Sequence, residues 1–123
     1  MSCLFNSISY FIHLNSNDIR QKICDYLQED LPIIEGIKTS QVLELENNSA
    51  ASDYISNMRS SSTWGGAIEI QVACNIWKIC INVKNFRDSN GKTIQFIPIN
   101  TSYDRSVELC WTGGHYEPIR DII

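Results

Sequence analysis

The N-terminal part of the chain repeats apolar residues with the period of an α-helix. Apolar side chains recur every three or four positions over residues 3–14 and again over 19–27. This spacing places them on one face of each segment, so it predicts two amphipathic helices. The polar stretch from Asn15 to Asp18 separates the two segments and contains residue types that cap a helix N-terminus.

A third helix is predicted to begin after Gly66. Gly66 can act as its cap, and Glu69 can bond the free N–H groups of the first turn. Most of the following residues up to Ile76 are apolar, so this helix should be largely buried. The pattern is weaker between residues 35 and 63. Segments 41–46 and 52–58 fit short helices, with polar breaks at 47–49 and 60–62.

After the third helix, the period of the apolar residues changes from that of an α-helix to two residues. Apolar residues occupy every second position from Trp77 to Val83, which predicts a half-buried strand. Asn90-Gly91 is a turn signal, and further strands are predicted over 93–97, 107–111 and 115–119. Because helices precede strands, we predict one α+β domain over residues 1–123, with helices packed on a small, mostly antiparallel sheet.

Composition narrows the classes of partner. The net charge is −4, and the ten Lys and Arg residues are scattered, which argues against nucleic acid and is compatible with a basic partner. No uncharged apolar stretch is long enough to span a bilayer, and the opening segment lacks a basic leader. We therefore expect a chain that has no export signal and does not associate with a membrane.

The five cysteines include no C-x-x-C pair, so neither a disulfide framework nor a zinc knuckle is indicated. This cysteine usage favours a reducing, intracellular setting. We expect a cytoplasmic location, which would be the host cytosol if the source is a virus or an intracellular microbe.

Cys3, His115 and Glu117 are the candidate chemical groups. Cys3 opens the first predicted helix, where the positive end of the helix dipole favours the reactive thiolate. His115 and Glu117 are two residues apart in a predicted strand, so their side chains should share a face. A thiol protease needs such a base and an acceptor that orients it. The structural alternative is a buried, inert thiol, a histidine bonded to backbone and a solvated glutamate.

Two glycine-containing segments have a similar ambiguity. Trp64-Gly65-Gly66 and Gly113-Gly114 can be turns or caps, or can let a substrate backbone pass close to the catalytic groups. A serine hydrolase is disfavoured because no G-x-S-x-G occurs. A zinc hydrolase is disfavoured because the two histidines lie far apart and neither has a second ligand at a suitable spacing. We expect no metal and no cofactor.

Several motifs occur together in a fixed order. Cys3-Leu4-Phe5 matches the second half of D-G-x-C-L-F, Tyr54 and Met58 match Tyr-x-x-x-Met, residues 64–69 match W-G-G-x-x-E, and Gly114-His115-Tyr116 ends the series. Over essentially the whole chain, these segments resemble the ovarian tumour (OTU) family of cysteine proteases, most of which are deubiquitinases.

The resemblance implies a papain-like fold and a catalytic set. Cys3 would be the nucleophile, His115 the base, and Glu117 the orienting group where the family usually has Asp or Asn. It also implies a monomer that removes ubiquitin or a ubiquitin-like modifier from substrate lysines. The residues implied to bind the substrate are Trp64, Gly65, Gly113, Gly114 and Tyr116.

The sequence departs from the family pattern ahead of Cys3. The family's aspartate, and the loop whose N–H groups help form the oxyanion hole, would precede Met1. Loss of one oxyanion donor costs about 100-fold to 1000-fold in rate. We therefore expect a fragment, a misassigned start codon or an impaired enzyme. The alternative functions are an OTU-like module that binds ubiquitin with impaired or no catalysis, and a structural domain with a buried cysteine.

Overall fold

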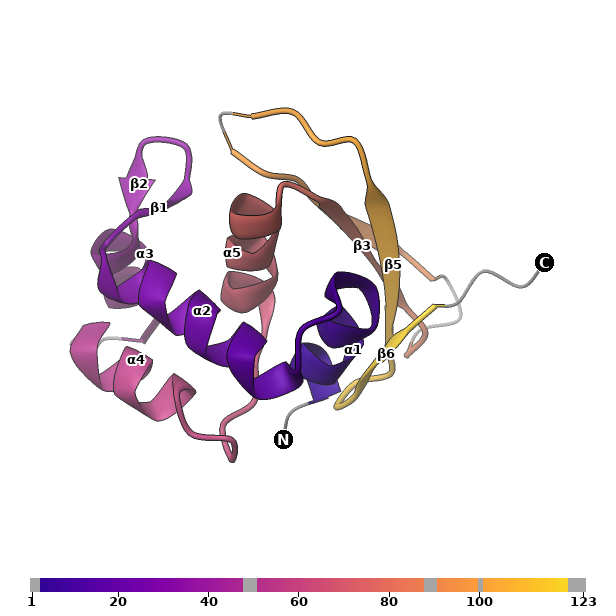
Figure 1. Cartoon of the computed structure of the whole chain (residues 1–123), viewed down its shortest axis with the longest axis horizontal. Coiled ribbons are helices and arrows are strands. Elements are labelled where there is room, and N and C mark those ends of the chain that lie inside the picture. The colour runs from indigo at the N-terminus through magenta and orange to yellow at the C-terminus, as the bar shows by residue number, and fades with distance from the viewer. Residues whose placement is uncertain (1–2, 48–50, 88–90, 100, 120–123) are drawn as a thin grey trace.

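The computed structural model describes residues 3–47, 51–87, 91–99 and 101–119, which form helices and two small sheets (Figure 1). The helices are α1 (Cys3–Ile12), α2 (Ser16–Gln28), α3 (Thr39–Asn47), α4 (Ala51–Met58) and α5 (Ala67–Trp77). The strands are β1 (Pro32–Ile34), β2 (Ile37–Lys38), β3 (Cys80–Asn85), β4 (Thr93–Phe96), β5 (Ser106–Trp111) and β6 (Tyr116–Pro118). The predicted α+β class is confirmed.

The larger sheet has the strand order β4-β3-β5-β6. β3 pairs with β4, and β5 with β6, in the antiparallel sense, as predicted. The central pair, β3 and β5, is parallel, with Ile81 opposite Val107. This pair is parallel because the chain leaves β4 at the end of the sheet where β3 begins and crosses over that end before starting β5. The backbone N–H of Cys80 donates to the carbonyl of Arg105 at this crossing.

The core lies between the sheet and the helices. α1 and α5 lie on the concave side of the sheet, α2 lies across both helices, and α3, α4 and the β1–β2 hairpin lie beyond α2 and α5 (Figure 1). The largest fully buried apolar side chains come from both layers and are Phe5, Leu4, Ile8, Ile19, Ile23, Leu27, Ile33, Leu43, Ile70, Ile81 and Leu109. No helix in the described ranges is long and apolar enough to cross a membrane.

The observed elements differ from the predicted ones in two places. The strand predicted from Trp77 is wrong at its start, because Trp77 ends α5 and Lys78 ends the helix in the left-handed conformation, with φ 54°. The β1–β2 hairpin was not predicted, and it turns at Gly36 with φ 79°. The predicted breaks at Asn48-Ser49 and the turn residue Asn90 lie outside the described residues.

Glu69 is a charged residue inside the core. It is 1% exposed at the start of α5, and its carboxylate accepts hydrogen bonds from the Gly66 N–H (2.8 Å) and the Tyr54 hydroxyl (2.7 Å). The predicted capping by Glu69 is therefore confirmed. Burial raises the pKa of the Glu69 carboxyl, and these hydrogen bonds oppose the rise.

Arg20 is the second buried charge. It is 1% exposed, and its guanidinium donates to the Met58 carbonyl at 2.7 Å and lies 4.2 Å from the centroid of the Phe5 ring. The charges of Arg20 and Glu69 also attract each other. Arg20 of α2 therefore ties α1 to the end of α4.

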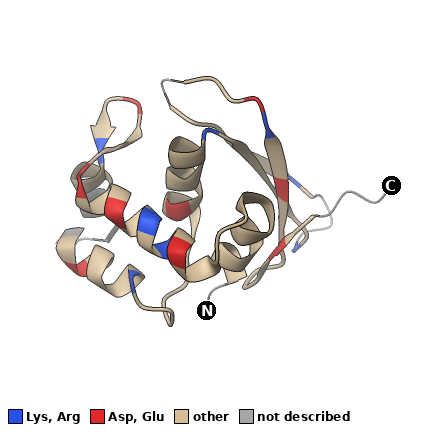
Figure 2. Ribbon diagram, viewed as in Figure 1, with Lys and Arg blue, Asp and Glu red and all other residues tan. Residues whose placement is uncertain are grey.

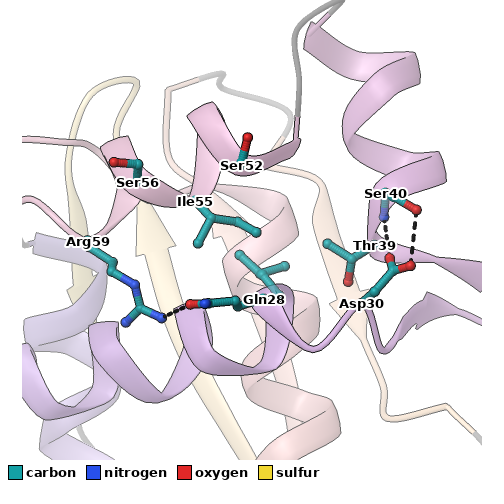
Figure 3. A pocket seen from close by; sticks show the side chains of 9 residues that line it. Gln28, Asp30, Thr39, Ser40, Ser52, Ile55, Ser56 and Arg59 are labelled. Carbon is teal, nitrogen blue, oxygen red and sulfur yellow. Dashed lines mark hydrogen bonds between the residues drawn. The ribbon is translucent and has the colours of Figure 1, made fainter.

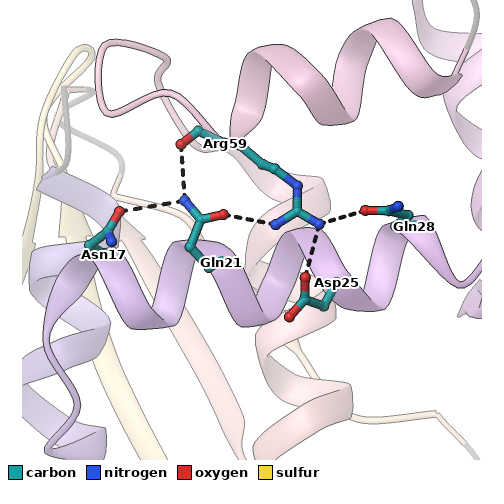
Figure 4. Close-up of polar contacts among 5 residues, drawn as sticks. All are labelled: Asn17, Gln21, Asp25, Gln28 and Arg59. Atoms are coloured by element: carbon teal, nitrogen blue, oxygen red, sulfur yellow. Dashed lines mark hydrogen bonds and ion pairs between the residues drawn. The ribbon is translucent and has the colours of Figure 1, made fainter.

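Outside the core, Arg59 joins the end of α4 to α2. Its guanidinium donates to Gln21 (2.8 Å), Asp25 (2.9 Å) and Gln28 (2.6 Å), all on one face of α2 (Figure 4). Residues of both charge signs occur along α2 (Figure 2). A single exposed ion pair contributes about 0–1 kcal/mol to the free energy of unfolding. The hydrogen bonds of Arg59 therefore mainly fix the orientation of the end of α4 relative to α2.

We predict that Glu69→Gln flattens the pH dependence of stability. A raised folded-state pKa means that this carboxyl favours the native state below its usual pKa near 4.5, and that this contribution is lost as pH rises through the folded-state pKa. The wild type should therefore lose stability relative to the variant as pH rises above about 4.5. Urea unfolding at a series of pH values measures the difference. A difference that is constant with pH would contradict the prediction.

We predict that Gly65→Ala lowers the free energy of unfolding by about 1–3 kcal/mol. A Cβ at Gly65 would lie 2.8 Å from Leu4 Cδ2 and 3.0 Å from the Phe5 ring, so α1 would have to shift. Gly114→Ala is the matched control, because its Cβ would meet only Trp64, at an ordinary 3.9 Å. Urea unfolding of both variants tests this, and equal losses of stability would contradict it.

Candidate active site

A surface pocket of about 290 Å³ lies between α1 and β6, which pack against each other. Its lining comes from opposite ends of the chain and consists of Cys3, Asn6, Ser7, Tyr10, His115, Tyr116, Glu117 and Pro118. The three residues predicted as nucleophile, base and orienting group therefore line the same pocket.

Cys3 is the first residue of α1 and is partly buried. Its carbonyl accepts a hydrogen bond from the Ser7 hydroxyl at 2.8 Å, which adds to the first turn of the helix. The inert-thiol alternative required a buried side chain, whereas Cys3 reaches a solvent-accessible pocket.

The other four cysteines, Cys24, Cys74, Cys80 and Cys110, are buried, and all five thiols are free. Burial raises the pKa of Cys24 to about 11 and that of Cys74 to about 12. Protonated thiols are poor nucleophiles, so these two are inert at neutral pH. Of the five cysteines, Cys3 is the one that lines this pocket.

The imidazole of His115 and the carboxylate of Glu117 are in contact. His115 Nε2 lies 3.2 Å from Glu117 Oε1, and both side chains are more than half exposed. His115 directly precedes β6 and Glu117 lies within it, so the two-residue repeat of extended backbone puts both on one side. If Nε2 donates to the carboxylate, Nδ1 has its lone pair free to accept a proton.

Tyr116 lies between His115 and Glu117 in the sequence and lines the same pocket. It is partly buried, and it lines both the Cys3 pocket and a neighbouring apolar hollow of about 190 Å³. Burial raises the pKa of Tyr116, and electrostatic interaction with Cys3 raises it further.

The two glycine-containing segments lie side by side. The Trp64 ring lies 3.9 Å from the position that a Cβ on Gly114 would occupy. Trp64 and Gly65 line a separate hollow of about 260 Å³, next to the start of α5, and not the pocket that contains Cys3. Gly113 has φ 108°, so the turn before His115 needs glycine whatever the segment binds.

Asn6 and Tyr10 are pocket residues that the sequence reasoning missed. They follow Cys3 by three and seven positions, so all three lie on one face of α1. That spacing was the available signal. It was hidden because the apolar positions of the same helix dominate its pattern.

A larger cavity of about 410 Å³ lies among α2, α3 and α4 (Figure 3). The Asp30 carboxylate at one end accepts hydrogen bonds from the Ser40 N–H (2.7 Å) and hydroxyl (3.2 Å), which lower the pKa of Asp30 and cap α3. Its lining includes serine hydroxyls but no histidine or cysteine. The cavity therefore lacks the nucleophile–base pair that the Cys3 pocket contains.

No three His, Cys, Asp or Glu side chains within the described ranges are grouped so that they could hold a metal ion. The chemistry that the Cys3 pocket can support is nucleophilic and acid–base, with the thiol and the imidazole as the reacting groups.

Known proteins resemble this chain over most of its length. It is 28% identical over 132 residues to the ubiquitin thioesterase otu2 of Schizosaccharomyces pombe, covering 96% of this chain and 42% of that protein. It is 29% identical over 125 residues to the ubiquitin thioesterase OTU1 of Mus musculus, covering 97% of this chain and 33% of that protein. The chain thus spans less than half the length of these relatives.

A solved ovarian tumour (OTU) domain in complex with ubiquitin has the same fold. It matches with a TM-score of 0.76 and 22% identity, over 95% of this chain and 62% of that one. The family model described as OTU-like cysteine protease matches residues 2–117 of this chain. The chain therefore belongs to the OTU-like cysteine protease family.

Proposed function

We propose that this chain is a cysteine isopeptidase that removes ubiquitin or a ubiquitin-like modifier from substrate lysines through a Cys3 acyl-enzyme. The observation that carries the proposal is the shared pocket of Cys3, His115 and Glu117, with His115 Nε2 3.2 Å from Glu117. Membership of the OTU-like cysteine protease family supports it, and the matched relatives are ubiquitin thioesterases.

The reaction follows from the roles of the three groups. His115 accepts the Cys3 proton, and the thiolate attacks the carbonyl carbon of the isopeptide bond. When the C–N bond breaks, His115 gives its proton to the leaving lysine amine, and the modifier remains as a thioester on Cys3. Water then attacks the thioester while His115 takes its proton, which releases a carboxylate and the free thiol.

Glu117 acts by fixing the imidazole. A hydrogen bond from Nε2 to the carboxylate sets the tautomer, leaves Nδ1 as the base and stabilises the imidazolium that forms. Glutamate is one methylene longer than the family's usual aspartate. The 3.2 Å distance between His115 Nε2 and Glu117 Oε1 supports this role for the longer side chain.

The glycine-containing segments fit the acyl side of the substrate. A modifier tail that ends in glycine needs clearance for its backbone and has no side chain there to accommodate. We assign Trp64, Gly65, Gly113, Gly114 and Tyr116 to the surface along which this tail lies. Trp64 and Gly114 are neighbours on that surface, because the Trp64 ring lies 3.9 Å from the position of a Cβ on Gly114.

We predict that ubiquitin with a C-terminal electrophile forms one covalent adduct with the wild-type chain and none with Cys3→Ala. The reason is that Cys3 is the thiol that lines the pocket. Intact-mass spectrometry measures the adduct. Cys110→Ala, which removes a buried thiol, is the control and should label as the wild type does.

The other outcomes of this labelling test separate the alternatives. Reversible binding of ubiquitin by the folded chain without an adduct would indicate a binding module. Neither binding nor an adduct, with a panel of modifiers, would indicate a structural domain.

We predict that Glu117→Ala lowers kcat/KM for a ubiquitin aminocoumarin substrate about 100-fold, because the imidazole loses its orienting acceptor. Glu117→Gln keeps an acceptor oxygen and should stay within about 10-fold of the wild type. Glu108→Gln is the control, because Glu108 is a partly exposed glutamate on the neighbouring strand, outside the pocket lining and paired with Lys84 at 2.9 Å. Equal rates for Glu117→Ala and the wild type would remove Glu117 from the catalytic set.

A further inference from the structure

The exposed face of α1 extends the Cys3 pocket in one direction. Cys3, Asn6 and Tyr10 follow one another along this face and all line the pocket. With a rise of 1.5 Å per residue, the face is about 10 Å long. Asn6 is exposed and Tyr10 is 46% exposed, so both side chains are accessible from the pocket.

The two flanks of Cys3 differ in chemistry. On one flank, Trp64 packs beside Gly114, and the glycine turn at Gly113 packs against Arg87. The other flank offers the side chains of Asn6, Tyr10 and Pro118 to a bound chain. Accessible side chains of this kind can contact a side chain of the substrate.

We propose that Asn6 and Tyr10 bind the leaving-group side of the substrate, namely the lysine side chain and the peptide around it in the protein that carries the modifier. This inference rests on the proposed isopeptidase function and names the residues that would select among acceptor proteins. Asn6 and Tyr10 are specificity determinants and take no part in the proton transfers.

The chemistry of this face suits a lysine. The lysine stem is four methylene groups long, and it can pack on the Tyr10 and Pro118 rings. The Tyr10 ring is held edge-to-face against Phe11, with centroids 5.0 Å apart and planes at 89°. The Asn6 amide can both donate to and accept from the peptide groups that flank the lysine.

Two substrates with the same acyl group and different leaving groups test this inference. One is ubiquitin joined to aminocoumarin, and the other is ubiquitin joined by an isopeptide bond to the lysine of a fluorescent peptide. The quantity compared is kcat/KM for the peptide substrate divided by kcat/KM for the aminocoumarin substrate. We expect Tyr10→Ala and Asn6→Ala each to lower this ratio by about 5-fold to 10-fold, because KM for the peptide substrate rises.

Conservative and control variants separate binding from folding. Tyr10→Phe keeps the ring and should restore the ratio to within about 2-fold of the wild type. Tyr103→Ala removes another exposed tyrosine, 40% exposed and outside the pocket lining, and should leave the ratio unchanged. Thermal unfolding of each variant checks that the fold is kept.

Each outcome of the experiment decides between the hypotheses. Equal losses on both substrates, or no loss on either, would overturn the inference and leave the isopeptidase function standing. A wild-type chain that cleaves neither substrate would overturn the proposed function, and this inference with it.

Discussion

The buried guanidinium of Arg20 is the interaction on which the position of the active site depends. Burial of a charge costs several kcal/mol unless hydrogen bonds and an opposite charge compensate for it. The compensation comes from three other helices: the Phe5 ring of α1, the Met58 carbonyl of α4 and the charge of Glu69 on α5. Phe5 follows Cys3 by two residues. The contact between the Phe5 ring and Arg20 therefore also holds the start of α1 in place.

The segment from Trp64 to Glu69 links that core to both walls of the site. Glu69 fixes its C-terminal end through Tyr54 and Gly66, and Gly65 lets its middle approach the side chains of Leu4 and Phe5. Trp64 at the other end lies beside Gly114, next to His115. The candidate nucleophile and the candidate base thus both lie next to one short segment that contributes neither group itself. This gives a physical reason for the W-G-G-x-x-E pattern: each of its fixed residues has a distinct packing task.

The candidate base and its candidate orienting group are accessible to solvent. His115 and Glu117 are more than half exposed, so water screens their interaction and an exposed ion pair alone is weak. The backbone next to β6, paired to β5, must therefore supply much of their alignment. A bound substrate would exclude water and strengthen the same contact, because electrostatic interactions grow as the local dielectric falls. Under the proposed function, the glycine segments and the face of α1 would position the scissile bond.

Periodicity and cap chemistry alone determined most of the elements, because amphipathic spacing and capping residues act locally: α1, α2 and α5 are where the pattern placed them. The sequence motifs likewise predicted the family and brought Cys3, His115 and Glu117 forward as candidates. Local pattern failed at Trp77, where apolar residues suit the end of a helix and the start of a strand equally, and Lys78 decides between them. Only the tertiary structure decided that β3 and β5 run parallel, that Arg20 and Glu69 are buried, and that Asn6 and Tyr10 share the pocket of Cys3. These features depend on contacts between residues far apart in the chain, and neither helical period nor residue type specifies such contacts.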